Sequence, residues 1–423
     1  QVGNFLLPLV SCGIVNGIIR FGLDKYYKKR DVFTTGFLTI LLGFIILLIL
    51  EPILVHVPYL NENTMMIYVF VLMSSMRSLC SQFVRAKGYV KLYAIDGLFS
   101  TATTIFFNVL YLVVLKWGIN GYMLAMISAD TLSTLFLFYV AGLRRYLHIR
   151  GLNLSTSQEM LRYSIPMIPN SIFWWVNNMA SRYMIAYFMG EEYNGLFAVA
   201  YKIPTIIVLM SNIFMDAWQM SAVSDSPDKR ASFFTRVFLF YQSLICTAAS
   251  GLILFSKVIT MILVSDSFYE SWKYIPLLLL STIFSCMSTF LGSVYMVEKK
   301  SMLNFITTGI GAVINVVLNF LFIPIFGVNG AAFATFLSYF VVFVLRVIDT
   351  RRFIPMHFHP MRLTFNTLVL LAQAFIMIFE VKGWIFFELI LTVLMVVANM
   401  SALLATVAQL LLKRRPHPQH HEE

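Results

Sequence analysis

Four charged residues lie inside long apolar stretches of the sequence: Arg77, Asp130, Arg182 and Lys202. If these stretches are transmembrane helices with a rise of 1.5 Å per residue, Arg77 lies about 17 Å and Asp130 about 14 Å from the outer ends. Arg182 and Lys202 each lie about 11 Å deep on the same scale. A charge at such depth costs about 2.5 to 3.5 kcal/mol on insertion scales and usually faces a partner or a hydrated cavity. Three cations against one carboxylate predict an anionic ligand.

Phosphate or diphosphate is the anion that best fits these side chains. The planar guanidinium of arginine donates two parallel hydrogen bonds to such groups, whereas lysine acts as a point charge. Two asparagines in the same apolar stretch as Arg182 add neutral hydrogen-bonding groups. The predicted substrate-binding residues are therefore Arg77, Arg182, Lys202, Asn177 and Asn178. Asp130 is predicted to be a coupling group or counterion, and no catalytic residue or metal ligand is predicted.

The same charges are also compatible with roles that involve no ligand. Arg77 and Asp130 would neutralise each other if they form a pair. Lys202 could extend its long apolar stem and bring its charge to the interface. Arg20, Arg85, Arg236 and Arg346 lie near predicted cytoplasmic ends, where interfacial anchoring is the simpler expectation.

Two prolines precede Arg182 in the same predicted helix. Pro166 and Pro169 each remove a backbone donor, and proline inside a helix bends or loosens it. A membrane tolerates such a defect only against protein or water. The two prolines are predicted to form a hinge, with a fixed kink as the alternative.

The amino-acid composition indicates a membrane protein. Of 423 residues, 59% are hydrophobic and only 12% are charged. Apolar runs of about 20 residues match the thickness of the hydrocarbon core, and they lack the alternation of barrel strands. The sequence predicts an all-α polytopic protein with thirteen spans, at residues 4–20, 33–55, 66–84, 92–115, 121–142, 164–189, 195–219, 236–262, 273–296, 303–323, 328–346, 363–380 and 384–412.

Lysine and arginine are concentrated in every second loop. They lie at Lys25, Lys28, Lys29 and Arg30, Arg85, Lys87 and Lys91, Arg144, Arg145 and Arg150, Lys229 and Arg230, Lys299 and Lys300, Arg351 and Arg352, and Lys413 to Arg415. This alternation predicts that these loops and the C-terminus are cytoplasmic. The first span would then begin outside, so we expect that an initial helix is missing and that the parent has fourteen spans.

The two halves of the sequence resemble each other. Residues 108–145 and 319–352 share an asparagine, an aromatic-rich run, a G-[IV]-N-G turn, another span and paired basic residues. An even number of helices separates the copies, which predicts a parallel duplication with the site between the halves. The predicted divisions are an N-terminal bundle at 1–142, a linker with an amphipathic surface helix at 143–163, a C-terminal bundle at 164–352, two additional helices at 353–412 and a cytoplasmic tail at 413–423.

Catalytic motifs are missing from the sequence. It contains no Walker A, GxSxG or HExxH pattern and no long loop with clustered carboxylates or histidines, which argues against an ATP-driven pump or an enzyme. The four cysteines lie in apolar runs, where a thiol behaves as a small hydrophobe. No cofactor is predicted, and coupling to protons or sodium stays open.

The segment IPMIPNSIFWWVNNMASRYMIAYFMGEEYNGLFAVAYKIP closely resembles the start of the second half of bacterial polysaccharide transporters of the lipid-linked oligosaccharide flippase type, and GIVNGIIRFGLDK resembles their second helix. These proteins belong to the multidrug/oligosaccharidyl-lipid/polysaccharide exporter superfamily, and the resemblance covers essentially the whole chain. It implies two bundles of six helices plus two more helices. Relatives often carry an acidic residue immediately before the arginine, where Ser181 stands here, so the coupling ion is in doubt.

The resemblance implies that the chain moves a polyprenyl-diphosphate-linked oligosaccharide across the bacterial cytoplasmic membrane by alternating access. Its expected partners are this substrate, membrane lipid and polysaccharide polymerase or glycosyltransferase machinery, without nucleic acid. Alternatives are a cation-coupled multidrug antiporter, which favours an acidic cavity, a flippase for the peptidoglycan lipid precursor and, less favoured, a membrane-embedded glycosyltransferase or polymerase.

Overall fold

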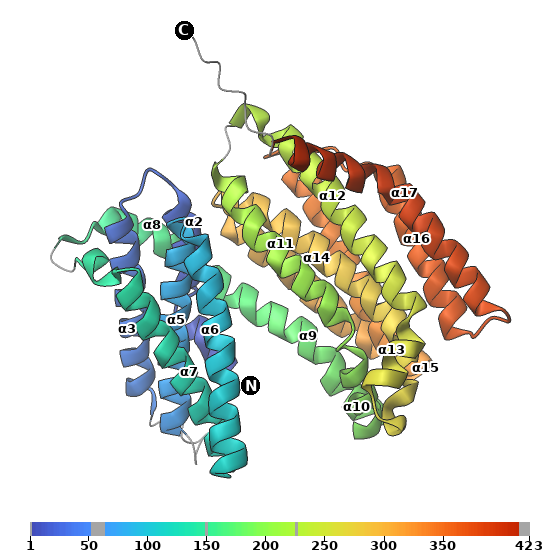
Figure 1. Ribbon diagram of the computed structural model, residues 1–423, viewed down its shortest axis with the longest axis horizontal. Coiled ribbons are helices and arrows are strands. Elements are labelled where there is room, and N and C mark those ends of the chain that lie inside the picture. The colour runs from blue at the N-terminus through green and yellow to red at the C-terminus, as the bar shows by residue number, and fades with distance from the viewer. Residues whose placement is uncertain (1, 52–63, 149–150, 225–226, 414–423) are drawn as a thin grey trace, which may run out of the picture. The chain divides into compact units, whose positions relative to one another are not determined.

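The computed structural model describes residues 2–51, 64–148, 151–224 and 227–413. The side chains of a few residues within these ranges, Trp175 and Asn178 among them, are outside the description. The described chain consists of helices and their connections, with no strand (Figure 1). The prediction of an all-α fold is therefore confirmed.

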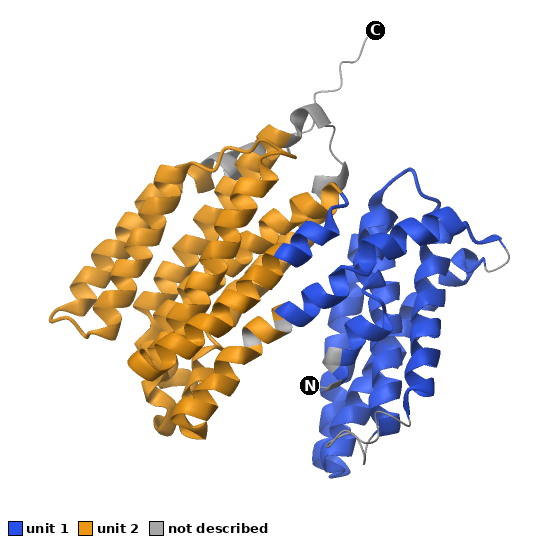
Figure 2. Ribbon diagram, turned by 180° about the vertical axis from the view of Figure 1, so that it is seen from behind, with its two compact units in different colours: residues 1–173, 299–306 blue, residues 174–298, 307–423 orange. Residues whose placement is uncertain are grey.

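The chain forms two compact units (Figure 2). Unit 1 comprises residues 1–173 and 299–306, and unit 2 comprises residues 174–298 and 307–423. The division falls within a helix, beyond the predicted linker at 143–163, and each unit is described by itself below.

Unit 1 is built around one central helix. Its elements are α1 (Val2–Val10), α2 (Ile14–Leu23), α3 (Lys29–Ile49), α5 (Thr64–Ala86), α6 (Val90–Asn108) with the π-helical turn η1 (Val109–Val114), α7 (Gly118–Val140), the 3-10 turn η2 (Leu143–Tyr146) and α8 (Leu154–Ser164). Helix α5 packs against α1, α2, α3, α6 and α7. This central position explains why α5 can carry a charged residue, because neighbouring helices supply the partners that lipid lacks.

The predicted linker contains the expected helix, α8, which packs against α2 and α3. Asn153 caps it by accepting hydrogen bonds from the backbone amides of Ser155 and Thr156 at 3.0 and 3.4 Å. The Ser157 hydroxyl lies 2.8 Å from that of Thr35 on α3. The linker helix is thus an integral part of unit 1.

Unit 2 is built around α14 (Ile275–Val297), which packs against α11, α12 and α16. Its elements also include most of α9 (Met167–Met189), α10 (Glu191–Ala200), α11 (Pro204–Ser224), α12 (Pro227–Leu254), α13 (Ser256–Leu263), the 3-10 segment η4 (Asp266–Tyr274), most of α15 (Ser301–Thr350), α16 (Pro360–Ile378) and α17 (Trp384–Lys413). Phe284, Phe290 and Phe343 contribute to one continuous apolar core. The predicted two additional helices, α16 and α17, share that core.

Within the described residues, the thirteen predicted spans fall on helices, with several changes of detail. The span at 236–262 consists of α12 and α13, which are separated at Phe255. The span at 4–20 is divided into α1 and α2 at Cys12 and Gly13, which have φ values of 48° and 62°. The span at 195–219 consists of α10 and α11, which are bent by 44°. The spans at 303–323 and 328–346 form the single element α15, interrupted by Gly327. By length and composition, nine helices of the described chain are able to cross a membrane, or ten with the bent pair.

The two G-[IV]-N-G motifs share two backbone features. The first glycine of each, Gly118 and Gly327, has a left-handed φ of 56° and 61°, which costs glycine little because it lacks a Cβ. A Cβ on the last glycine would meet a backbone carbonyl oxygen of the preceding helix in both copies. The distances would be 3.0 Å from Gly121 to Tyr111 and 2.2 Å from Gly330 to Phe322. The motif therefore reverses the chain and allows two successive helices to pack closely.

Candidate functional site

Unit 1 contains a buried cluster of charged groups on α5, α6 and α7. The Arg77 guanidinium donates from Nη1 to Asp130 Oδ1 at 3.1 Å and from Nε to Ser133 Oγ at 3.2 Å. Ser74 donates to the other oxygen of Asp130, and Ser133 donates to Asp96. We call these five residues the unit 1 charged cluster.

The composition of this cluster corrects the charge count made from the sequence. Arg77 is paired with Asp130, so it is not a free cation, and the two residues neutralise each other. Asp96, which is only 1% exposed, was missed because it lies near one end of its apolar stretch and resembles an interfacial residue. One guanidinium between two carboxylates gives the cluster a formal charge of −1.

Unit 2 contains a buried cluster of uncharged polar groups on α9 and α15. The Asn319 amide nitrogen donates to Ser181 Oγ at 3.1 Å and to Asn315 Oδ1 at 2.9 Å, and Ser181 lies 3.1 Å from Thr335. Ser338 donates to the amide oxygen of Asn177 at 3.3 Å. We call this the unit 2 amide cluster; its members are Asn177, Ser181, Asn315, Asn319, Thr335 and Ser338.

Asn177 was predicted to contact substrate, but its side chain forms a hydrogen bond within this cluster. It is 4% exposed, and its oxygen already accepts a hydrogen bond from Ser338. The cluster thus supports the part of α9 that carries Arg182. The side chain of Asn178, the other asparagine in the prediction, lies outside the described residues.

Arg182 and Lys202 are the two cations within predicted spans of unit 2 that motivated the anion hypothesis. The Arg182 side chain is half-buried on α9, directly after Ser181 of the amide cluster, and Lys202 is exposed. In the described part of the chain, no carboxylate forms an ion pair with either residue.

Lys202 lies in the turn between α10 and α11 and not inside a continuous helix. Pro204 begins α11, and proline cannot donate the hydrogen bond that would continue α10. The chain therefore breaks and bends by 44° at this point. The break places Lys202 immediately before the N-terminus of α11, where backbone amides without helical partners create partial positive charge.

Pro166 and Pro169 also begin a helix and do not kink one. Helix α8 ends at Ser164, and α9 begins at Met167, so Pro166 lies in the connection and Pro169 in the first turn. Proline is tolerated there because first-turn amides have no helical acceptor. The predicted kink is therefore a junction between two helices. Its role as a hinge stays a prediction.

Three of the four arginines expected at the membrane interface are buried inside their own units. Arg346 is 5% exposed, and it donates to the Ser288 carbonyl at 2.7 Å and to Thr307 and Thr308 at 3.1 and 2.9 Å. Arg20 and Arg85 are 7% and 3% exposed. Carbonyl and hydroxyl acceptors satisfy Arg346, and such partners cannot be identified from a single sequence.

A second ionic group in unit 1 lies at the end of α2 and beyond it. Lys299 donates to the Tyr27 hydroxyl at 2.8 Å and lies 3.7 Å from Asp24, which also pairs with Arg20 at 3.2 Å. Burial lowers the pKa of the Lys299 ammonium, and the charge of Arg20 lowers it further. Burial, followed by a hydrogen bond to Glu159, raises the pKa of Tyr27. These contacts attach the start of α15 to unit 1.

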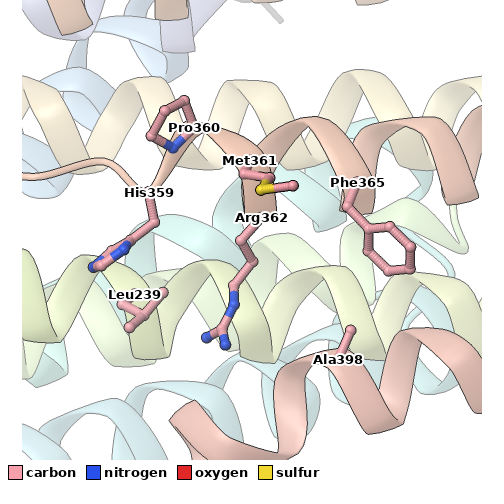
Figure 3. Close-up of a pocket in the computed structure, with 7 residues that line it drawn as sticks. All are labelled: Leu239, His359, Pro360, Met361, Arg362, Phe365 and Ala398. Carbon is pink, nitrogen blue, oxygen red and sulfur yellow. The ribbon is translucent and has the colours of Figure 1, made fainter.

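A cavity of about 570 Å³ lies where α16 begins (Figure 3). Its lining combines Leu239 of α12 and Ala398 of α17 with residues around the first turns of α16: His359, Pro360, Met361, Arg362 and Phe365. The Arg362 guanidinium donates to Ser401 Oγ at 3.1 Å. This lining is mostly apolar, and the sequence analysis did not predict the cavity.

The sequence matches one known protein family. Residues 2–273, more than half of the chain, match the family described as "Polysaccharide biosynthesis protein". No curated protein is similar enough in sequence to be compared.

Solved structures of MATE transporters share the fold. A multidrug resistance MATE family transporter of the MOP superfamily in an outward-facing conformation has a TM-score of 0.68 at 12% identity, covering 82% of this chain and 84% of that chain. The MATE transporter ClbM in complex with Rb⁺ has a TM-score of 0.67 at 15% identity, covering 83% and 85%. Vibrio cholerae VcmN in the bent form has a TM-score of 0.61 at 14% identity, covering 84% and 87%.

These matches cover both units, and at such low identity they establish the architecture alone. The match to the family covers most of unit 1 and the part of unit 2 that contains Arg182 and Lys202. The chain therefore belongs to the polysaccharide biosynthesis protein family, and its apolar helices share the fold of the MATE transporters.

Proposed function

We propose that this protein is a flippase that moves a polyprenyl-diphosphate-linked oligosaccharide across the bacterial cytoplasmic membrane by alternating access. The basic loops and the C-terminus would face the cytoplasm, in agreement with the positive-inside pattern. Polysaccharide polymerase or glycosyltransferase machinery would supply and consume the substrate. Transport requires no catalytic residue in the chain, because no covalent bond of the substrate changes.

The observation that carries this proposal is the pair of cations without carboxylate partners in unit 2. Arg182 and Lys202 have no ion pair among the described residues, whereas Arg77 has one. Leaving a cation within a membrane span is costly unless a ligand or water compensates it. A diphosphate would compensate both charges, with Arg182 as the bidentate donor and Lys202 as the point charge.

The break before α11 supports an anion at Lys202. Discontinuous helices in transporters direct their positive N-terminal ends toward anionic substrate groups. Lys202 adds a full charge beside the partial charge of the α11 N-terminus. The exposed position of Lys202 leaves its ammonium available to a ligand.

The unit 1 charged cluster is our candidate for ion coupling. With Arg77 neutralising one carboxylate, the second is left to bind a proton or a sodium ion. Asp130 and Asp96 are joined through Arg77 and Ser133, so a cation bound at either carboxylate would alter the hydrogen bonds among α5, α6 and α7. Such a change would connect ion occupancy to the shape of unit 1.

The proposal can be tested in a strain that depends on this protein for surface polysaccharide. Arg182→Ala and Lys202→Ala should each abolish or strongly reduce surface polysaccharide while the protein remains inserted at normal abundance. Lipid-linked oligosaccharide should then accumulate in the inner leaflet. The matched control is Arg162→Ala, which removes an exposed cation on α8 and should leave export unchanged.

Normal surface polysaccharide in the Arg182→Ala/Lys202→Ala double variant would reject the proposed site. Accumulation of an undecorated lipid carrier without oligosaccharide would instead indicate an enzymatic role. The two results are distinguishable by extracting and sizing the lipid-linked sugars.

The negative charge of the unit 1 cluster favours one second candidate, a cation-coupled multidrug antiporter. An acidic buried site suits organic cations, and Asp96 adds a carboxylate that the charge count from the sequence did not include. Under that alternative, Asp96→Asn would abolish resistance to cationic drugs and leave surface polysaccharide intact. Under the flippase proposal, Asp96→Asn impairs polysaccharide export and has no effect on drug resistance.

A further inference from the structure

Helices α16 and α17 of unit 2 are joined by a series of polar pairs. Asn366 and Asn399 exchange hydrogen bonds between their side-chain amides at 3.1 and 3.0 Å, and both side chains are almost completely buried. Farther along the same helices, Gln373 of α16 reaches Glu388 and Thr392 of α17. Hydrogen bonds of this kind hold transmembrane helices together where lipid gives no hydrophobic drive.

Glu388 is the unusual member of this series because it is ionisable and 0% exposed. Its Oε2 accepts a hydrogen bond from Gln373 Nε2 at 2.8 Å. Its Oε1 is buried and has no hydrogen-bond partner in the described part of the chain. The amide oxygen of Gln373, which is also 0% exposed, likewise lacks a partner among the described residues.

These two acceptors lack a donor, and the surrounding side chains do not provide one. Gln373 Nε2 also lies 3.1 Å from Thr392 Oγ1, and Ser250 of α12 donates to that hydroxyl at 3.4 Å. Thr392 Oγ1 accepts from both groups, and neither hydroxyl forms a hydrogen bond with the two unpaired oxygens. One additional hydrogen on the Glu388 carboxyl would supply the missing donor.

No described cation on the helices packed against α17 faces Glu388. The described side chains of α12 include three titratable groups, Arg236, Tyr241 and Cys246. Arg236 is about 20 Å from the level of Ser250 along the helix at 1.5 Å per residue. Asp228, Lys229 and Arg230 precede Arg236 in the sequence of α12. Arg362, together with His359 at the start of α16, lies about 16 Å or more from the level of Gln373 on the same scale.

Beyond the other ends of these helices, the cation Lys257 of α13 is engaged elsewhere. It pairs with Glu380 at 2.7 Å and packs over the rings of Trp272 and Trp384. Lys382 lies in the connection before α17. A bare Glu388 carboxylate would thus be an uncompensated buried charge, which a low-dielectric interior strongly disfavours.

We propose that Glu388 is a proton-binding site that holds α16 and α17 together when it is occupied. A proton taken from water converts the carboxylate into a carboxylic acid, whose O–H donates to the Gln373 amide oxygen. Gln373 Nε2 donates to the other carboxyl oxygen in return, which completes a reciprocal pair like that of Asn366 and Asn399. Loss of the proton leaves a buried charge and two acceptors without a donor, so it loosens these helices from each other.

Infrared spectroscopy of the full chain in lipid nanodiscs tests this directly. At neutral pH the wild-type spectrum should contain a protonated carboxylic acid C=O band that Glu388→Gln removes. The matched control Glu192→Gln changes an exposed carboxylate at the start of α10 and should leave the band unchanged. Identical wild-type and Glu388→Gln spectra in this region would show that Glu388 is ionised and would overturn the proposal.

A second measurement does not depend on how well Glu388→Gln folds. Gln373→Leu keeps the carboxyl and removes its amide partner, so the same C=O band should shift to the frequency of a less hydrogen-bonded acid. An unchanged band in Gln373→Leu would contradict the reciprocal pair. Thermal unfolding adds a pH test: the wild-type midpoint should fall as pH rises through the titration of Glu388, and an identical fall in Glu388→Gln would contradict the site.

Discussion

The two units bury polar groups in different ways. In unit 1 the cluster is ionic, with Arg77 between Asp130 and the Ser133–Asp96 pair. In unit 2 the cluster consists of amides and hydroxyls, linked through Asn319 and Ser181. Arg182 and Lys202 of unit 2, in contrast, form no ion pair among the residues that the structure describes. Under the proposed function, this difference would separate two roles, with a small cation acting on unit 1 and an anionic substrate binding to unit 2.

This difference is notable because the two halves share a repeat. Each G-[IV]-N-G turn precedes a helix that contributes to the buried cluster of its unit, through Asp130 and Ser133 in one half and Thr335 and Ser338 in the other. The two backbone features are common to both copies, whereas the side-chain chemistry has diverged. The turn therefore determines how closely successive helices pack, and the residues that follow it determine the chemistry of each buried cluster.

The largest expected effect comes from breaking the ionic cluster. Asp130→Ala leaves the guanidinium of Arg77 without its carboxylate and should lower the free energy of unfolding by about 3 kcal/mol. This value is at the low end for breaking a buried pair because the Arg77 side chain is partly exposed. Asn319→Ala in the neutral cluster should cost about 1 kcal/mol, the usual value for a lost hydrogen bond. Denaturant or thermal unfolding in detergent measures both changes.

The double variant Arg77→Met/Asp130→Leu is the control for this prediction. Replacing both partners by apolar side chains removes the uncompensated charge, so it should recover most of the stability lost in Asp130→Ala. Equal losses in Asp130→Ala and Asn319→Ala would remove the energetic distinction between the two clusters.

The second-largest effect is expected from alanine substitutions at the last glycine of each G-[IV]-N-G motif. A Cβ on Gly330 would lie 2.2 Å from the Phe322 carbonyl oxygen, against 3.0 Å for Gly121 and Tyr111. Because backbone must move in the first case, Gly330→Ala should lower stability by about 2 kcal/mol or more, and Gly121→Ala by about 1 kcal/mol, within the usual range for overpacking. Thermal unfolding midpoints of the two variants give the order, and the reverse order would refute this role of the motif in packing.

Substitutions in the unit 1 charged cluster, and not in the unit 2 amide cluster, should affect ion coupling. Asp96→Asn keeps the shape of the side chain but removes the second carboxylate of the unit 1 charged cluster, so it should reduce gradient-driven transport about 10-fold, within the usual range of coupling energies. Ser181→Ala in the unit 2 amide cluster should leave the gradient dependence unchanged. Transport measured in vesicles with and without an imposed proton or sodium gradient separates the two. Full gradient dependence in Asp96→Asn would exclude Asp96 as the coupling group.

The smallest effect concerns a charged pair of unit 2, between Lys257 of α13 and Glu380, which follows the end of α16. A hydrogen bond from Lys257 lowers the pKa of Glu380. Because the folded-state pKa lies below the unfolded value of about 4.3, the pair stabilises the fold above that pH, and the contribution is lost as pH falls through the lowered pKa. The unfolding midpoint of wild type should approach that of Glu380→Gln on acidification. A constant difference between them at every pH would contradict the pair.

Most of the architecture could be predicted because transmembrane helices appear in the sequence as long apolar stretches. Within the described residues, the thirteen predicted spans fall on helices, and the duplicated G-[IV]-N-G motif marks equivalent turns. The breaks before α2 and α11 were missed because hydropathy averages over short interruptions. Pro204 was nevertheless a visible signal, since proline at that position cannot continue the preceding helix.

The site was harder to predict because pairing depends on which helix faces are adjacent. Depth along a helix suggested Arg77 and Asp130, but only packing shows that Asp96 of α6 joins them through Ser133. Arg346 illustrates the same limit, because its partners are a backbone carbonyl and two hydroxyls that no charge pattern reveals. Arg182 and Lys202 remain predictions for substrate contact, strengthened by the lack of ion pairs in the described chain.

The most direct test of the central claim uses purified protein in liposomes that carry a labelled polyprenyl-diphosphate oligosaccharide in one leaflet. A membrane-impermeant reagent then reports how much of the sugar reaches the opposite leaflet. Wild-type protein should raise that fraction above protein-free vesicles, and the Arg182→Ala/Lys202→Ala variant should not. Equal transfer by the variant and the wild type would show that these cations do not bind the diphosphate.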